Sequence, residues 1–216
     1  MEKRIAIIMA AVAATLLCLG SCKNNSGSEG KEENKNPEGK EKAEGKIAEA
    51  SEEKVIDVVY LANLYCKTED MDKARIFLGK ATNPLFEVQK DVENNYASVY
   101  ARTQYQNSLE FYMWTDKDGT KILGVNLTEE GEKGHNRKSL AFYTYEARLD
   151  MVVPCKRLNE IITNKLLSMR REISAFVLRI PKSPEDENIT FGYWEKKDKD
   201  KYNELVFKWD GHTFNI

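Results

Sequence analysis

Two stretches near the middle of this 216-residue chain are candidate partner strands, and the side chains of the first alternate with a period of two. The first runs from Leu109 to Trp114 and the second from Ile122 to Leu127, and the sequence Asp116-Lys117-Asp118-Gly119 between them is typical of a tight turn. Alternation places successive side chains on opposite faces of a strand. The pattern therefore predicts an antiparallel hairpin.

The chain from residue 48 onward combines further strands with a few helices. We expect strands near residues 96–105, 140–146, 175–180, 189–194 and 204–209, and helices over residues 51–65, 69–78 and 151–169. The last helix has Pro154 in its first turn and one apolar stripe, made of Cys155, Leu158, Ile161, Ile162, Leu166 and Met169. Runs of strands joined by turns, beside a few helices, predict an α+β fold in which antiparallel sheet packs against helices.

A weak internal similarity links two of the expected strands. Ser108–Trp114 lies 80 residues before Asn188–Trp194, and each is preceded by a strand and, further back, by a helix. Only Phe and Trp are identical between the two stretches. Two helix-plus-three-strand units are one interpretation, and a chance similarity between two amphipathic strands is the simpler one.

This layout is similar to that of small envelope lipoproteins and secreted inhibitors in which a helix pair packs on a three- or four-stranded antiparallel sheet. The beta-lactamase-inhibitor-like arrangement is one example. The resemblance is architectural, and it carries no motif that would assign a role to any residue.

The N-terminal residues contain the three parts of a secretory signal. Two basic residues, Lys3 and Arg4, precede an apolar run from Ile5 to Leu19, and two small residues lead from there to Cys22. The run is shorter than the roughly 20 apolar residues that a membrane-spanning helix needs. A basic flank, a short apolar core and a small-residue exit are typical of a signal peptide.

The sequence Leu19-Gly20-Ser21-Cys22 resembles the lipobox of bacterial lipoproteins. The resemblance implies that residues 1–21 are removed and that Cys22 becomes the acylated first residue, a palmitate-type anchor. Cys18 fits less well, because bulky leucines precede it. The alternative is an ordinary signal peptide, or an uncleaved anchor, with a chance cysteine. The polar segment after Cys22 and the ending Lys208-Trp209-Asp210-Gly211 also resemble uncharacterised Bacteroidota lipoproteins, which implies no known activity.

A polar segment separates the signal from the rest of the chain. Lys23–Lys46 has six Lys and six Glu and lacks aromatic and large aliphatic residues. Such a segment buries too little apolar surface to offset the entropy of ordering it. We therefore expect residues 22–47 to be a lipidated cysteine and a disordered tether, and residues 48–216 to be a single α+β domain. A surface-export signal is a weaker alternative, because Lys23-Asn24-Asn25 is not acidic.

Two cysteines follow the tether, Cys66 and Cys155. An exported location permits a disulfide between them, and such a bridge would stabilise the fold by closing a long loop. Two buried free thiols are the alternative, since cysteine also behaves as a small apolar core residue.

The sequence contains no recognisable catalytic or metal-binding constellation. Its two histidines are His135, in a polar loop, and His212, in a terminal turn. The 116–119 turn resembles a calcium loop only faintly, because Leu127 stands where an EF-hand has its twelfth-position carboxylate. With 33 basic and 35 acidic residues the formal net charge is −2, which does not favour nucleic-acid binding. We expect no cofactor and no metal.

The aromatic residues are in mild excess and include Tyr112, Trp114 and Trp194. These three lie on the strand faces opposite the more apolar ones. If they are exposed, they suit contact with a protein or a glycan. If a second core covers them, they are packing residues.

Taken together, these patterns predict a lipid-anchored cell-envelope protein that binds a macromolecule without catalysis. The outer membrane is favoured, and the domain would face the periplasm or the cell surface. A glycan-binding accessory lipoprotein is one alternative, and an envelope hydrolase with an unrecognised carboxylate or cysteine site is another. The partner is the membrane through Cys22, together with a protein or glycan that the sequence does not name.

Overall fold

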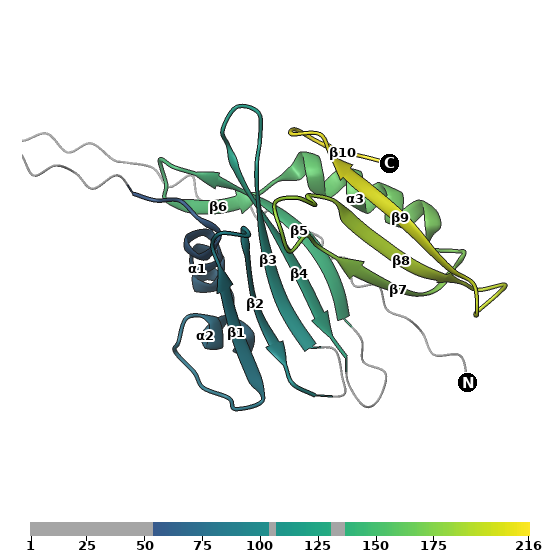
Figure 1. Ribbon diagram of the computed structural model, residues 1–216, viewed down its shortest axis with the longest axis horizontal. Coiled ribbons are helices and arrows are strands. Elements are labelled where there is room, and N and C mark those ends of the chain that lie inside the picture. The colour runs from purple at the N-terminus through teal and green to yellow at the C-terminus, as the bar shows by residue number, and fades with distance from the viewer. Residues whose placement is uncertain (1–53, 104–106, 131–136) are drawn as a thin grey trace, which may run out of the picture. The chain divides into compact units, whose positions relative to one another are not determined.

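The computed structural model describes residues 54–103, 107–130 and 137–216. In these ranges the chain forms two antiparallel sheets, of six and four strands, and three helices (Figure 1). This confirms the predicted α+β class. The expectations for the lipobox, Cys22, the tether and His135 fall outside the described residues. No helix in the described ranges is long and apolar enough to span a membrane.

The six-stranded sheet is a meander in which each strand pairs with the next one along the chain. Its strands are β1 (Phe86–Asp91), β2 (Tyr96–Ala101), β3 (Asn107–Thr115), β4 (Lys121–Glu129), β5 (Arg137–Glu146) and β6 (Met151–Pro154). The predicted hairpin is formed by β3 and β4, in a register that pairs Phe111 with Val125.

The four-stranded sheet follows later in the chain and has the strand order β10-β9-β8-β7. Its strands are β7 (Ile173–Arg179), β8 (Ile189–Glu195), β9 (Tyr202–Trp209) and β10 (Phe214–Asn215). The two similar stretches of sequence therefore lie in different sheets, with six and four strands rather than three each.

Three helices accompany the sheets: α1 (Val58–Thr68), α2 (Asp72–Phe77) and α3 (Lys156–Met169). The first begins later than the predicted start at residue 51. Its N-cap is Asp57, whose carboxylate accepts a hydrogen bond of 2.7 Å from the Tyr60 backbone N–H. Thr68, which directly precedes the predicted second helix, is the last residue of α1 and donates its hydroxyl to the Tyr65 carbonyl.

Helices α1 and α2 pack on one face of the six-stranded sheet and form the first core. The alternating residues Leu109, Phe111 and Met113 of β3 point into it and are almost fully buried. Phe111 contacts the rings of Tyr65 and Phe77, with centroids 5.9 and 5.1 Å apart. Aromatic contacts of this kind contribute about 0.5–1.5 kcal/mol each beyond the area they bury.

The opposite face of the same sheet carries a second core. Trp114 and Phe142 of the six-stranded sheet meet Leu158 and Ile162 of α3, together with Phe191 and Phe207 of the four-stranded sheet. The central sheet thus lies between α1 and α2 on one side and α3 with the smaller sheet on the other (Figure 1).

Further elements differ from the sequence prediction. The segment 151–154 was expected to begin a helix, but it forms β6, an edge strand paired with β5, and α3 begins only at Lys156. An edge position tolerates Pro154, which has no N–H to donate. The strand β1 was not predicted at all, because its exposed edge position leaves only a weak alternation in the sequence.

The bridge considered between Cys66 and Cys155 is not formed, and both residues are buried free thiols. Cys66 belongs to the core under α1 and Cys155 to the core under α3. Because these cores lie on opposite faces of the sheet, the two residues do not meet the short separation that a disulfide requires. Burial, aided by the negative charge of Glu69, raises the pKa of Cys66 to about 12.

A pair of glycine-to-alanine substitutions tests the packing of the second core. A Cβ atom added at Gly124 would lie 2.4 Å from a ring carbon of the buried Trp114, whereas one at Gly192 would meet the hydroxyl end of the exposed Tyr202. We predict that Gly124→Ala lowers the free energy of unfolding by about 2–3 kcal/mol, because the indole has no room to move. Gly192→Ala should cost less than about 1 kcal/mol, because Tyr202 can turn into solvent. Urea unfolding followed by circular dichroism measures both, and equal losses would contradict this packing.

Candidate functional site

Tyr112 and Trp114, considered from the sequence as exposed ligand-binding aromatics, are fully buried. The interpretation that a second core covers them is the correct one. Each ring also directs its polar group toward the loop between β7 and β8, residues 180–188. The Tyr112 hydroxyl donates to the Ser183 carbonyl at 3.2 Å, and the Trp114 indole N–H donates to the Glu187 carbonyl at 2.9 Å.

The 180–188 loop is also stabilised by hydrogen bonds within the loop and to β9. The Asp186 carboxylate accepts hydrogen bonds from both the backbone and the side-chain amide of Asn188, at 3.2 and 2.8 Å. The side-chain oxygen of Asn188 in turn accepts from the Trp209 backbone N–H on β9 at 3.3 Å. The loop is therefore fixed both to the smaller sheet and to the larger one.

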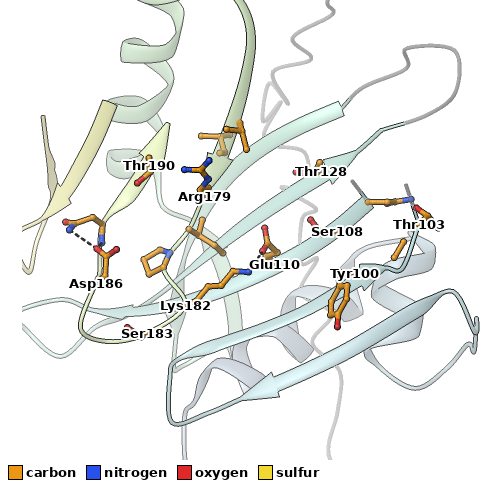
Figure 2. Close-up of a pocket in the computed structure, with 17 residues that line it drawn as sticks. Tyr100, Thr103, Ser108, Glu110, Thr128, Arg179, Lys182, Ser183, Asp186 and Thr190 are labelled. Atoms are coloured by element: carbon orange, nitrogen blue, oxygen red, sulfur yellow. Dashed lines mark hydrogen bonds and ion pairs between the residues drawn. The ribbon is translucent and has the colours of Figure 1, made fainter. Parts of the chain in front are cut away.

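Between this loop and the larger sheet lies a cleft of about 710 Å³ (Figure 2). Strands β2, β3 and β4 contribute its floor, with Ser108, Glu110 and Thr128. Strand β7 and the 180–188 loop contribute the facing wall, which includes Arg179 and Lys182. In Figure 2 the side chain of Lys182 extends from the loop toward Glu110.

The floor is polar although it belongs to the same sheet face as the second core. Where that core covers the sheet, one row across it reads Tyr96, Tyr112, Gly124 and Phe142. The next row on the same face reads Ser98, Glu110, Asn126 and Leu140, and the one after it Tyr100, Ser108, Thr128 and Lys138. The face thus changes from apolar to polar along the strands, and the cleft lies over the polar end.

Glu110 is the centre of a hydrogen-bond network in the floor. Its Oε1 accepts from the Tyr96 hydroxyl at 2.9 Å and its Oε2 accepts from Asn126 Nδ2 at 2.8 Å. Burial and the nearby charge of Glu110 raise the pKa of Tyr96, so its hydroxyl remains a donor. Asn126 is fully buried, and its Oδ1 accepts no hydrogen bond from any residue the structure describes.

The edge of β7 that faces the larger sheet is engaged by side chains rather than by another strand. Asn126 Nδ2 lies 3.4 Å from the Leu178 carbonyl oxygen, and Lys138 Nζ lies 3.2 Å from the Phe176 carbonyl oxygen. These contacts satisfy edge carbonyls that would otherwise be open to pairing. They also hold the wall of the cleft against its floor.

The two basic residues in the lining, Arg179 and Lys182, each lie beside a carboxylate. Lys182 Nζ lies 3.8 Å from Glu110 Oε1 and 5.4 Å from the centre of the Tyr96 ring. Arg179 forms an ion pair of 3.0 Å with Glu204 on β9.

Trp194, the third predicted aromatic, lies half-buried on the outer face of the smaller sheet. Its ring packs against that of Tyr202, with centroids 4.9 Å apart, and the Tyr202 hydroxyl donates to Glu204 at 2.7 Å. This outer aromatic pair, Trp194 and Tyr202, is connected to the cleft through the Glu204–Arg179 ion pair.

His212 belongs to a separate polar cluster that stabilises the C-terminal turn. Its Nδ1 lies 2.9 Å from the buried carboxylate of Asp116, which also accepts from Arg157 of α3 at 3.0 Å. The predicted 116–119 turn thus joins the hairpin to the C-terminal turn. In the described residues, no group of three or more His, Cys, Asp or Glu side chains is placed to hold a metal ion.

No protein-family model, curated protein or solved structure matches this chain.

Sequence reasoning missed the cleft residues, although a signal for them was present. On β3 the positions facing the second core change from Tyr112 and Trp114 to Glu110 and Ser108, while the opposite face stays apolar. A polar run on one face of a strand whose opposite face is apolar points to a functional surface.

The Glu110 network yields a matched pair of asparagine-to-aspartate substitutions. We predict that Asn126→Asp lowers the free energy of unfolding at pH 8 by about 2–4 kcal/mol, because it places a buried carboxylate against that of the partly buried Glu110. The deficit should shrink at pH 5, where one of the two carboxylates binds a proton. Asn203 also donates to a glutamate, Glu195, at 3.1 Å, but it is only half-buried. Asn203→Asp should therefore cost less than about 1 kcal/mol in the same urea titration. A pH-independent loss in Asn126→Asp would contradict the placement of the two groups.

Proposed function

We propose that this chain is a lipid-anchored protein of the bacterial cell envelope, and that it binds a macromolecule in the cleft between its two sheets without altering it chemically. The single observation that carries this proposal is the cleft itself. Its floor places Glu110, Ser108 and Thr128 on a sheet face whose other end carries the apolar second core.

The construction of the cleft supports a role in binding. Buried polar groups weaken a fold unless they are fully paired, and here Asn126 is buried beside Glu110 with one oxygen unpaired in the described structure. Apolar residues at these positions would simply extend the second core. A rigid wall, fixed by Tyr112 and Trp114, is also what preorganised recognition needs.

The chemistry of the cleft supports binding more than catalysis. The neighbours of Glu110 are an amide, a phenol and an ammonium group. The other carboxylate in the lining, Asp186, is engaged by two N–H groups of Asn188. Cys155 is buried in the second core, and its backbone N–H donates to the Phe142 carbonyl.

The anchor is proposed from the lipobox resemblance at Leu19-Gly20-Ser21-Cys22. One acyl chain gives only reversible membrane binding, whereas two or more give durable attachment. A flexible tether of the composition of Lys23–Lys46 would span about 25–30 Å root-mean-square. The domain would then stand clear of the lipid headgroups, most simply at the outer membrane, with its cleft free to bind.

Substitution of Cys22 tests the anchor. In a bacterial host that processes lipoproteins, we predict that the wild-type chain partitions into the detergent-rich phase of Triton X-114 and that Cys22→Ala shifts it to the aqueous phase. Cys18→Ala is the matched control, because it removes the neighbouring cysteine of the same apolar run, and it should leave partitioning unchanged. Equal partitioning of wild type and Cys22→Ala would contradict lipidation at Cys22.

Crosslinking in living cells tests the cleft. A photoreactive benzophenone amino acid at Thr190, which lines the cleft, should give an adduct of higher mass on immunoblots. The same amino acid at Thr163, a half-buried threonine on α3, is the matched control and should give none. Adducts from both positions, or from neither, would contradict the proposal that the cleft is the binding site.

A further inference from the structure

We propose that the ligand of the cleft is a neutral, hydroxyl-rich chain, a segment of an uncharged polysaccharide. The inference rests on the proposed function of the cleft and names the class of molecule that its chemistry fits. Three observations carry it: the acceptor capacity of Glu110, the pairing of charges around the cleft, and the closed edge of β7.

Glu110 presents hydrogen-bond acceptors in the floor. An ionised carboxylate has about four acceptor sites, and the protein fills two of them, with Tyr96 and Asn126. The side chain is 17% exposed and lines the cleft, so its remaining sites are accessible from that side. A ligand that satisfies them has to bring O–H or N–H donors.

The paired charges favour an uncharged donor. An ammonium or guanidinium ligand would meet Lys182 and Arg179 in the wall, and a phosphate, sulfate or carboxylate ligand would meet Glu110 and Asp186. Hydroxyl groups avoid both repulsions, and they can also accept hydrogen bonds from Lys182. The hydroxyls of Ser108, Thr128 and Thr190 in the lining suit the same kind of partner.

The edge of β7 argues against an extended peptide as the occupant. Peptides bind to sheets most readily by adding a strand to a free edge. On the side of β7 that faces the larger sheet, the carbonyls of Phe176 and Leu178 are already bonded to Lys138 and Asn126. A peptide in the cleft would have to displace these contacts, whereas a saccharide needs side-chain groups alone.

The cleft also has an appropriate size and rigidity. Its volume of about 710 Å³ is within the 300–1,000 Å³ that is common for small-ligand sites. Preorganised polar groups discriminate strongly for ligands that pair with all of them, because an unmatched buried group costs free energy. The fixed 180–188 loop and the Glu110 network provide this preorganisation.

The test is affinity electrophoresis of the purified full-length chain in native gels that contain one polysaccharide each. The neutral probes are dextran, pullulan, galactomannan and arabinoxylan, and the anionic probe is polygalacturonate. We expect at least one neutral polysaccharide to retard the chain, and polygalacturonate not to. The retardation should change less than about twofold between 50 and 500 mM NaCl, because an uncharged ligand forms no screened ion pair.

Two substitutions test whether the polysaccharide binds in the cleft. Glu110→Gln keeps the shape but removes the charged acceptor, and it should weaken binding about tenfold. Lys182→Ala alters a side chain that is 70% exposed, so folding should be unaffected, and it should weaken binding several-fold. The matched controls are Glu160→Gln and Lys156→Ala on the exposed surface of α3, which should bind as wild type does.

Each result of these experiments either supports or overturns the proposal that the ligand is a neutral polysaccharide. It is overturned if no neutral polysaccharide retards the chain, if only polygalacturonate does, or if both cleft substitutions bind normally. Loss of binding in Tyr202→Ala alone would move the site to the outer aromatic pair and would also overturn it. The proposed function is judged separately: a crosslink from Thr190 to a protein would support binding in the cleft while excluding a saccharide.

Discussion

The contact between Trp114 and the 180–188 loop is the interaction on which the rest of the structure most depends. The indole is fully buried at the centre of the second core, against Phe142 and Phe214, and its N–H reaches the carbonyl of Glu187. Gly124 leaves the space that the ring occupies. One side chain thereby joins the two sheets and positions the wall of the cleft.

The central sheet uses its two faces differently. The face under α1 and α2 is apolar along β3, from Leu109 to Met113, and forms an ordinary core. The other face is apolar at one end and polar at the other, where it carries Glu110 and Asn126. Natural proteins depart from regular apolar patterning mainly at functional sites. The polar end of this face is therefore where we expect a ligand to bind.

Much of the fold followed from the sequence, because alternation and turn residues are local signals. The β3–β4 hairpin and the α+β class were predicted for this reason, whereas β1, at a solvent-exposed edge, has too little alternation to be recognised. The segment 151–154 was misread because Pro154 suits both the first turn of a helix and an edge strand.

The cleft could not be predicted, because it depends on contacts between distant parts of the chain. Trp114 and Glu187 are 73 residues apart, and Asn126 and Leu178 are 52 residues apart. The sequence shows that Tyr112 and Trp114 share a strand face, but not that the 180–188 loop covers it. The same long-range contacts place Glu110 at the cleft, where its carboxylate has accessible hydrogen-bond acceptor sites. The sequence alone does not distinguish Glu110 from the other glutamates.

The most direct test of this account is amide hydrogen exchange, measured by mass spectrometry on the wild-type chain and on Trp114→Phe. Phenylalanine retains a ring in the core but cannot donate to Glu187. If Trp114 fixes the wall of the cleft, exchange in residues 180–188 should accelerate by about tenfold, as expected for the loss of one hydrogen bond, while exchange in α1 stays unchanged. Unchanged exchange in the 180–188 loop, or equal acceleration in every element, would contradict the account.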